Sequence, residues 1–288
     1  MVLIGALAAL AAALCWTLAS SLWRALPTSL SAGQLNLLKN LLAAALLWPL
    51  VWGRPWPMAP QQVLLLALSG VVGIAMGDSL YFAALRRLGT RRTLTLDAGG
   101  PAVTAMAGMV WLSERPTGLD WLGLVLITSA LLLVATRQTG PGESARRQWQ
   151  GVVMALGALL CGSSGALLSR AALRDFSVDP LQSALMRLLA ATVVLLPLLM
   201  TLPRGGLGPK PAHWRWPLAL LATLLGTTAG IALQQTALQR LPGGLAVALL
   251  ATAPVMALPL AALEGDRPGW RGWSAALLAI AGVSCVVL

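Results

Sequence analysis

Long apolar stretches alternate with short polar gaps along the whole chain of 288 residues. A helix needs roughly 20 apolar residues to cross the hydrocarbon core of a bilayer. Runs of this kind predict an all-α integral membrane protein with about ten transmembrane helices. The expected spans are residues 2–22, 32–52, 61–85, 94–112, 118–136, 150–170, 181–202, 216–237, 241–263 and 270–288.

The first apolar run, GALAALAAALCW at residues 5–16, also resembles a secretion signal. No basic residue precedes it, and Leu14 stands where a lipoprotein signal needs a small residue before Cys15. We therefore expect this run to be retained as the first helix.

The two halves of the chain resemble each other in four segments that follow the same order. Residues 1–136 and 150–288 form the expected repeats, and the polar stretch 137–149 forms the linker between them. Five spans in each repeat would invert the second copy in the membrane, an architecture of many secondary carriers that bind substrate near the midplane. A non-transporting scaffold that arose by gene duplication remains the alternative. The aligned pairs include Cys15 with Cys161, Arg24 with Arg170, Gly73 with Gly226, Gly77 with Gly230 and Pro101 with Pro254.

Composition supports lipid as the surrounding solvent, since 58% of the residues are apolar, 10% are charged and the mean hydropathy is +0.79. The net charge of +11 comes from basic residues in the gaps between apolar runs, so we expect no nucleic-acid partner. Three cysteines in apolar stretches and one histidine provide no disulfide framework, metal site or haem site. We expect no cofactor, and as partners the lipid bilayer, a small-molecule substrate and at most a second copy of the chain.

The distribution of basic residues predicts an orientation in the membrane. The loops after the odd-numbered spans carry thirteen basic residues and the opposite loops carry five, so both chain ends are expected outside. The thirteen are Arg24, Arg86, Arg87, Arg91, Arg92, Arg137, Arg146, Arg147, Arg204, Lys210, Arg215, Arg267 and Arg271, and the five are Arg54, Arg115, Arg170, Arg174 and Arg240.

With these features, the chain resembles the EamA-type exporters of the drug/metabolite transporter superfamily. The resemblance rests on CWTLASSLWRAL at the first span, on LSERPTGLDWLGLVLITSALLLVA at residues 112–135, and on a proline-bearing helix before each such turn. It implies ten helices, a central cavity, alternating access and export of small metabolites such as amino acids or drugs. Many relatives keep both chain ends inside, in contrast to the charge count. The matching positions are Trp16, Pro101, Glu114, Arg115 and Gly123, and in the second copy Pro254, Asp266 (where glutamate is usual), Arg267 and Gly272.

Four charged residues lie within the expected spans, where a charge at the centre costs about 2.5–3.5 kcal/mol on insertion scales. Lys39, Asp78, Asp97 and Arg187 have no charged twin in the other repeat, so we expect them to serve substrate chemistry. Asp78 or Asp97 would contact a substrate amine or accept a coupling proton. Two buried ion pairs, or pairing of Asp78 with the basic cluster at 86–92, remain structural alternatives.

The stretch MGDSLYF at residues 76–82 places Asp78, Tyr81 and Phe82 on one helical face. The second repeat has Gln234 and Gln235 at the places of the two aromatic residues. Small residues four apart in both helices would allow close packing. The remaining expected substrate-binding residues are Trp16 and Asn40, and Pro101 and Pro254 are expected to kink gating helices.

These patterns predict a secondary transporter for a small amphipathic metabolite in a bacterial inner membrane, with proton coupling as one option. An intramembrane aspartyl protease that uses Asp78 and Asp97 is the enzymatic alternative. However, Ala75 stands where the Gly-x-Gly-Asp motif of such proteases has its first glycine, and the residue directly before Asp97 is not the tyrosine of their second motif. The chain also has no Walker loop for ATP.

Overall fold

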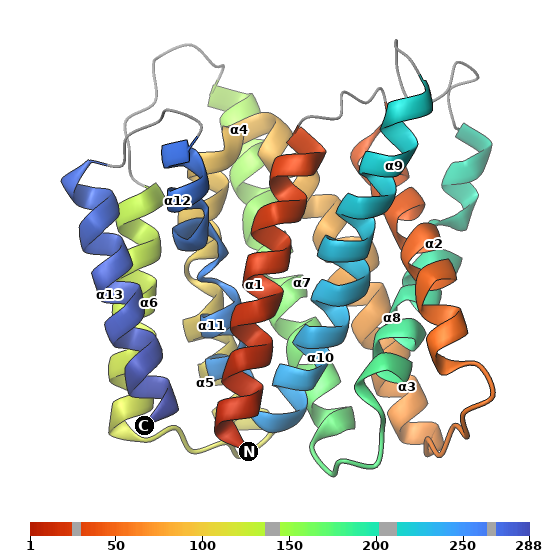
Figure 1. Cartoon of the computed structure of the whole chain (residues 1–288), viewed down its shortest axis with the longest axis horizontal. Helices are drawn as coiled ribbons and strands as arrows, with labels where there is room; N and C mark the ends of the chain where they lie inside the picture. Colours follow the sequence, from red (N-terminus) through yellow and green to blue (C-terminus); the bar gives the residue numbers. More distant parts are fainter. Residues whose placement is uncertain (25–29, 136–144, 202–211, 264–268) are drawn as a thin grey trace.

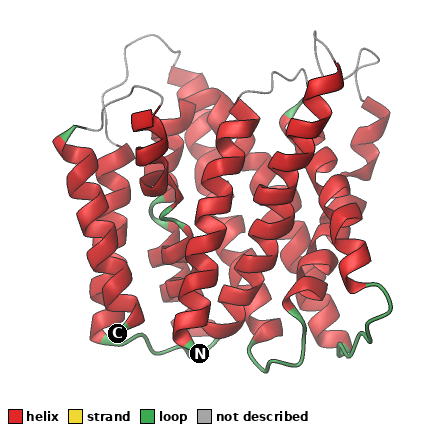
Figure 2. Ribbon diagram, viewed as in Figure 1, coloured by secondary structure: helices red, strands yellow, loops and turns green. Residues whose placement is uncertain are grey.

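The computed structural model describes residues 1–24, 30–135, 145–201, 212–263 and 269–288, and these contain helices and no strand (Figures 1 and 2). The α-helices are α1 Val2–Arg24, α2 Ala32–Val51, α3 Pro60–Ser69, α4 Ser79–Asp97, α5 Gly100–Trp111, α6 Gly118–Ala135, α7 Ala145–Leu173, α8 Pro180–Leu195, α9 Ala212–Thr223, α10 Gly230–Arg240, α11 Gly243–Leu250, α12 Ala253–Leu263 and α13 Trp270–Val287. Two π-helical segments, η1 Gly70–Asp78 and η3 Leu224–Ala229, and one 3-10 segment, η2 Leu196–Thr201, complete the order.

The helices form the expected ten membrane-crossing units. Seven of them are long and apolar enough to cross a bilayer by length and composition, and two shorter apolar helices, Gly118–Leu133 and Gly243–Leu258, are the fifth and ninth units. The remaining, fourth unit contains the 12-residue α5. The third unit, Pro60–Leu88, runs through α3, η1 and the first part of α4, and the eighth, Trp216–Arg240, runs through α9, η3 and α10. The rest of α4 leads into the fourth unit, which continues with α5.

Two expected boundaries are wrong. The loop expected between residues 85 and 94 is helical, because α4 continues without a break to Asp97. Arginine and leucine favour helix, and no proline interrupts the stretch before Pro101. The sixth span also begins earlier than the expected residue 150, since α7 starts at Ala145 within the stretch expected as linker; residues 136–144 lie outside the described residues.

The fourth and ninth units contain helix breaks near their prolines. The chain turns at residues 98–99 before α5, with Pro101 in the first turn of that helix. In the second copy α11 ends at Leu250, and Pro254 is the second residue of α12. Proline lacks the backbone N–H that a helix interior needs, but it fits the first turn of a helix, where that group has no partner. The expected kinks are therefore complete breaks.

The two repeats interlock through equivalent glycine contacts. In one contact, a Cβ added to Gly73 of η1 would lie 3.2 Å from the Cα of Gly165 in α7. In the other, a Cβ added to Gly226 of η3 would lie 2.6 Å from the Cβ of Ala19 in α1. Because Ala19 and Gly165 are aligned positions, the first helix of each repeat packs on the third unit of the other. These close approaches confirm the packing role predicted for the paired glycines.

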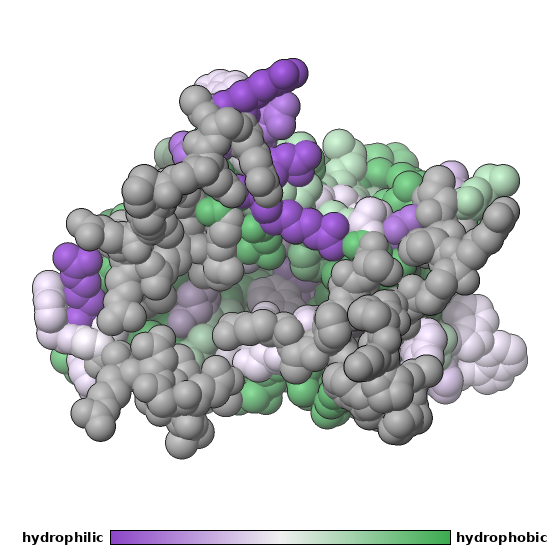
Figure 3. Space-filling view, turned by 90° about the horizontal axis from the view of Figure 1, so that it is seen from above, coloured by the Kyte–Doolittle hydropathy of each residue, from purple (hydrophilic) through white to green (hydrophobic). Residues whose placement is uncertain are grey.

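The repeats are inverted with respect to each other. In Figure 1, α1 starts on the face that carries both chain ends, whereas α7 ends on that face. The connections between α2 and α3, α5 and α6, and α7 and α8 run along the same face. The opposite face is hollowed near its centre (Figure 3). Several residues of the charge count, Arg204, Lys210 and Arg267 among them, lie outside the described residues, as does Asp266.

Candidate functional site

The end of η1 brings Asp78 to the middle of the bundle through an unusual backbone. Asp78 is the last of the nine residues of this π-helical segment, and such segments are rare and frequently lie at functional sites. The fully buried Asn36 of α2 donates from its amide to Ile74 O at 2.8 Å and to Ser79 Oγ at 3.2 Å. Asn40 donates to Asn36 Oδ1 at 3.2 Å. This amide pair therefore supports the π segment at the point where Asp78 is presented.

Asp78 forms an ion pair with Lys39 of α2. The Lys39 ammonium also lies 5.4 Å from the centre of the Phe82 ring, a distance suited to a cation–π interaction. Phe82 in turn packs edge-to-face against Tyr81, with ring centres 6.3 Å apart. One ion pair of the structural alternative is thus present, and the base that pairs with Asp78 belongs to α2. The Arg91 and Arg92 side chains of the basic cluster lie outside the described part of the chain.

Asp97 is the last residue of α4 and directly precedes the break before α5. It forms no ion pair with any described residue, and it is only partly buried. Tyr81 interacts electrostatically with both Asp97 and Asp78. The second acid of the expected set therefore stays unpaired beside the same aromatic residue.

Arg187 of α8 carries the second intramembrane positive charge, and its guanidinium donates from Nη1 to Gln234 Oε1 at 3.1 Å. The neighbouring Gln235 accepts a hydrogen bond of 2.9 Å from Ser183 Oγ, and both of these side chains are fully buried. Arg187 interacts electrostatically with Asp78 without reaching ion-pair distance. The two glutamines of the second repeat thus join α8 to α10 next to the charged residues of the first repeat.

Trp16 lies at the interface between α1 and the second repeat. Its indole N–H donates to the carbonyl of Gly226 in η3 at 2.8 Å, and a Cβ on Gly230 would come within 2.4 Å of Nε1. The π segment of each copy therefore has a carbonyl bound by a side-chain donor. The donors are Asn36 in the first copy and Trp16 in the second.

A second polar cluster closes the bundle near the face with the chain ends. The Glu114 carboxylate accepts from Arg170 Nε at 3.1 Å and from the backbone N–H of Gly243 at 2.9 Å, at the start of α11. Arg170 Nη1 donates to the carbonyls of Leu238 and Gln239 at 3.0 and 2.8 Å, at the end of α10. The pair satisfies unpaired backbone groups at two helix ends and ties the α5–α6 turn, α7, α10 and α11 together.

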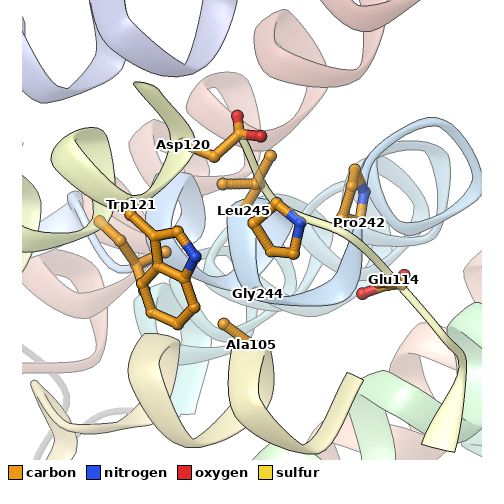
Figure 4. Close-up of a pocket in the computed structure, with 9 residues that line it drawn as sticks. Ala105, Glu114, Asp120, Trp121, Pro242, Gly244 and Leu245 are labelled. Carbon is orange, nitrogen blue, oxygen red and sulfur yellow. The ribbon is translucent and has the colours of Figure 1, made fainter. Parts of the chain in front are cut away.

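The Glu114 carboxylate borders a small cavity (Figure 4), which leaves about 10 Å³ for the centre of a water molecule. That volume holds about one water. The walls belong to α5, the α5–α6 turn, α6 and α11, so no larger solute binds here while the Glu114–Arg170 cluster is closed. The lining residues are Ala105, Glu114, Pro116, Asp120, Trp121, Leu124, Pro242, Gly244 and Leu245.

Three important polar residues were not predicted from the sequence. Asn36 and Ser183 were not distinguished from other polar residues in apolar helices, although an amide at a fully buried position is a detectable signal. Arg170 was assigned to a loop, whereas it lies within α7 and binds Glu114. Within the described residues, no three His, Cys, Asp or Glu side chains gather in a way that could hold a metal ion.

Comparison with known proteins places this arrangement in a family. The sequence matches the EamA-like transporter family over residues 3–136 and 149–288, one match for each repeat. A protein of known crystal structure superimposes with a TM-score of 0.76 over 98% of this chain and 95% of its own length, at 17% identity. At that identity the likeness concerns the fold alone.

Two named relatives match shorter segments. A protein named as a sugar uptake protein from Lactiplantibacillus plantarum is 26% identical over 104 residues, which are 34% of this chain and 36% of the relative. A protein named "Uncharacterized transporter in cobO 3'region" from a Sinorhizobium species is 34% identical over 86 residues, which are 29% of this chain and 59% of the relative. The matches therefore span about a third and three fifths of the relatives' lengths. The chain, an integral membrane protein with two interlocked five-helix repeats, belongs to the EamA-like transporter family.

Proposed function

We propose that this membrane transporter moves a small amphipathic metabolite across a bacterial inner membrane as a secondary carrier. The observation that carries the proposal is the polar cluster of Lys39, Asp78, Tyr81, Arg187 and Gln234. Side chains of both repeats contribute to it, between helices that otherwise bury apolar surface. Intramembrane ionisable residues are expensive, so they typically mark a substrate or ion pathway.

Alternating access is the transport mechanism that the proposal adopts. The Glu114–Arg170 cluster joins helix ends on the face with the chain ends, while the opposite face is hollowed. The helix breaks near Pro101 and Pro254 occupy equivalent places in the repeats. Discontinuous helices at equivalent positions of inverted repeats are typical of carriers that open alternately to either side.

Proton coupling is the second part of the proposal, and Asp97 is the residue on which it rests. An acid without an ion-pair partner at a helix break can exchange a proton with less rearrangement than a paired one. Asp78, by contrast, would have to release Lys39 before it could bind a proton or a substrate amine. We therefore assign proton exchange to Asp97 and substrate contact to the Lys39–Asp78 pair.

Reconstituted proteoliposomes test the proposal with a panel of labelled amino acids, sugars and amphipathic drugs, each with and without a proton gradient. Sugars belong in the panel because one relative is named for sugar uptake. We expect at least one solute to enter vesicles that contain the wild type but not empty vesicles, and Asp78→Asn to reduce its uptake. Accumulation that depends on the gradient should be lost in Asp97→Asn. Uptake that is the same with and without the proton gradient would contradict proton coupling. Absence of uptake for every solute would contradict the proposed carrier function.

A further inference from the structure

Arg187 is a buried guanidinium with far fewer protein acceptors than it has donors. Its side chain is 3% exposed, and among the described residues it finds an acceptor for Nη1 alone, the Gln234 side chain. Nε is buried without an acceptor, and Nη2 makes no hydrogen bond to any described residue. Each buried donor left without a partner costs about 1–3 kcal/mol, and more when the group is charged.

The charge of Arg187 also has no ion-pair partner among the described residues. Its nearby acid, Asp78, is paired with Lys39, and no carboxylate of the described residues lies within 4.0 Å of the guanidinium. A structural role alone would favour a buried partner acid, because a paired charge costs less than an unpaired one. The arrangement therefore leaves one positive charge of the cluster for a ligand.

The unused donors lie on one edge of the guanidinium. Nε–H and Nη2–H point in nearly the same direction, and this edge binds a carboxylate through two parallel hydrogen bonds. Gly73 lies beside it, since an added Cβ would come within 3.4 Å of Nη2. The backbone is held as well, because an added Cβ at Gly70 would lie 2.1 Å from the Arg187 carbonyl oxygen. The two glycines thus place no side chain against Arg187 and allow η1 to pack closely on it, while the edge itself is buried.

We propose that the Nε–Nη2 edge of Arg187 binds a carboxylate group of the transported solute and selects acids over their neutral analogues. This inference rests on the proposed function, because it assigns a substrate class to the same polar cluster. A single guanidinium matches one carboxylate in charge and shape. A phosphate ester carries more charge, and the only other base of the cluster, Lys39, is already paired.

Matched pairs of acids and neutral or amide analogues test the inference. Suitable probes are hexanoate with hexanamide, leucine with leucinamide, and gluconate with glucose. Binding is measured as a shift in the unfolding temperature of the purified full-length protein, and transport as uptake into proteoliposomes. We expect the acid of at least one pair to bind at least about tenfold more tightly than its analogue, as two charge-assisted hydrogen bonds would give.

Three variants separate recognition from folding. Arg187→Gln removes the charge, Arg187→Lys keeps the charge without the paired donors, and Gln234→Glu places an acid at the atom that Nη1 already contacts. Acid binding should fall about 10- to 100-fold in Arg187→Gln and in the nearly isosteric Gln234→Glu, and by an intermediate amount in Arg187→Lys. Arg54→Gln, which alters a half-exposed arginine outside the cluster, should leave acid binding unchanged.

The outcomes distinguish this inference from the proposed function. Transport of solutes without preference for the acid would overturn the inference and leave the carrier intact. Tighter binding of phosphate esters than of carboxylates would also overturn it, as would unchanged acid preference in Gln234→Glu. Acid binding that depends on Arg187 without any transport would support the anion site and contradict the carrier function.

Discussion

The ion pair between Lys39 and Asp78 joins α2 to the end of η1, and its contribution to stability follows from its burial. Breaking a fully buried pair costs about 3–5 kcal/mol, whereas exposed pairs contribute about 0.2–1 kcal/mol. The Lys39 side chain is 12% exposed and that of Asp78 is 35% exposed, which places the pair between these limits. We expect Lys39→Met and Asp78→Asn each to lower the free energy of unfolding by about 1.5–3 kcal/mol.

The double variant should be no less stable than the better single variant, because it leaves neither charge unpaired. The resulting coupling energy is therefore at least about 1.5–3 kcal/mol, and it is measured with a double-mutant cycle by SDS titration in mixed micelles. A matched control is the pair of Arg54 and Asp179, at 3.6 Å and with both side chains 40% or more exposed. Arg54→Gln and Asp179→Asn should couple by less than about 1 kcal/mol, since asparagine keeps the helix cap. Strictly additive effects at Lys39 and Asp78 would refute the reasoning.

Three further substitutions test packing, the closed face and a surface acid. Gly165→Leu should prevent stable folding, since a Cβ added to Gly165 would lie 2.7 Å from the Cα of Gly73. The control variant Gly162→Ala, whose added Cβ would meet no atom within 4 Å, should elute normally in size-exclusion chromatography. The same elution profile for both variants would contradict the packing. Glu114→Gln should lower the unfolding free energy in SDS by about 3 kcal/mol by leaving Arg170 unpaired, and an unchanged value would remove the cluster's structural role. Hydrogen bonds from Ser177 lower the pKa of Asp175. The carboxylate therefore stabilises the fold above its unfolded-state pKa, and this stabilisation is lost as the pH falls through its lowered folded-state pKa. Asp175→Ala should weaken the acid dependence of the unfolding free energy, and an identical pH profile would contradict this.

Much of the fold could be predicted from the sequence, because each helix that crosses a membrane needs an apolar stretch of roughly 20 residues. Apolar length gave α2 and α13 to within a residue, and repeated glycines predicted which helices pack closely. The helical stretch before Asp97 was missed because its arginines and threonines resemble a loop in hydropathy, whereas helix formation depends on backbone compatibility. The π segments could not be predicted, since neither has a distinct composition.

The candidate site was only partly predictable. The lack of repetition identified Lys39, Asp78, Asp97 and Arg187 as a special set, but it could not say which charges pair. Pairing depends on the rotation of α2 against η1, which hydrophobic periodicity specifies poorly because the apolar residues of α2 are spread over all sides of the helix. For the same reason, sequence alone left Arg187 with several candidate partners, whereas the structure gives its Nη1 an amide acceptor and leaves its Nε buried without one.

The central claim is that the chain is a carrier whose polar cluster is exposed alternately to the two sides of the membrane. Counterflow tests it most directly: proteoliposomes without ATP are loaded with unlabelled solute, diluted, and offered the same solute in labelled form. A carrier predicts transient uptake above the equilibrium level in the wild type and much less in Asp78→Asn. Labelled solute that only rises to equilibrium, whether or not the vesicles are preloaded, would contradict the account.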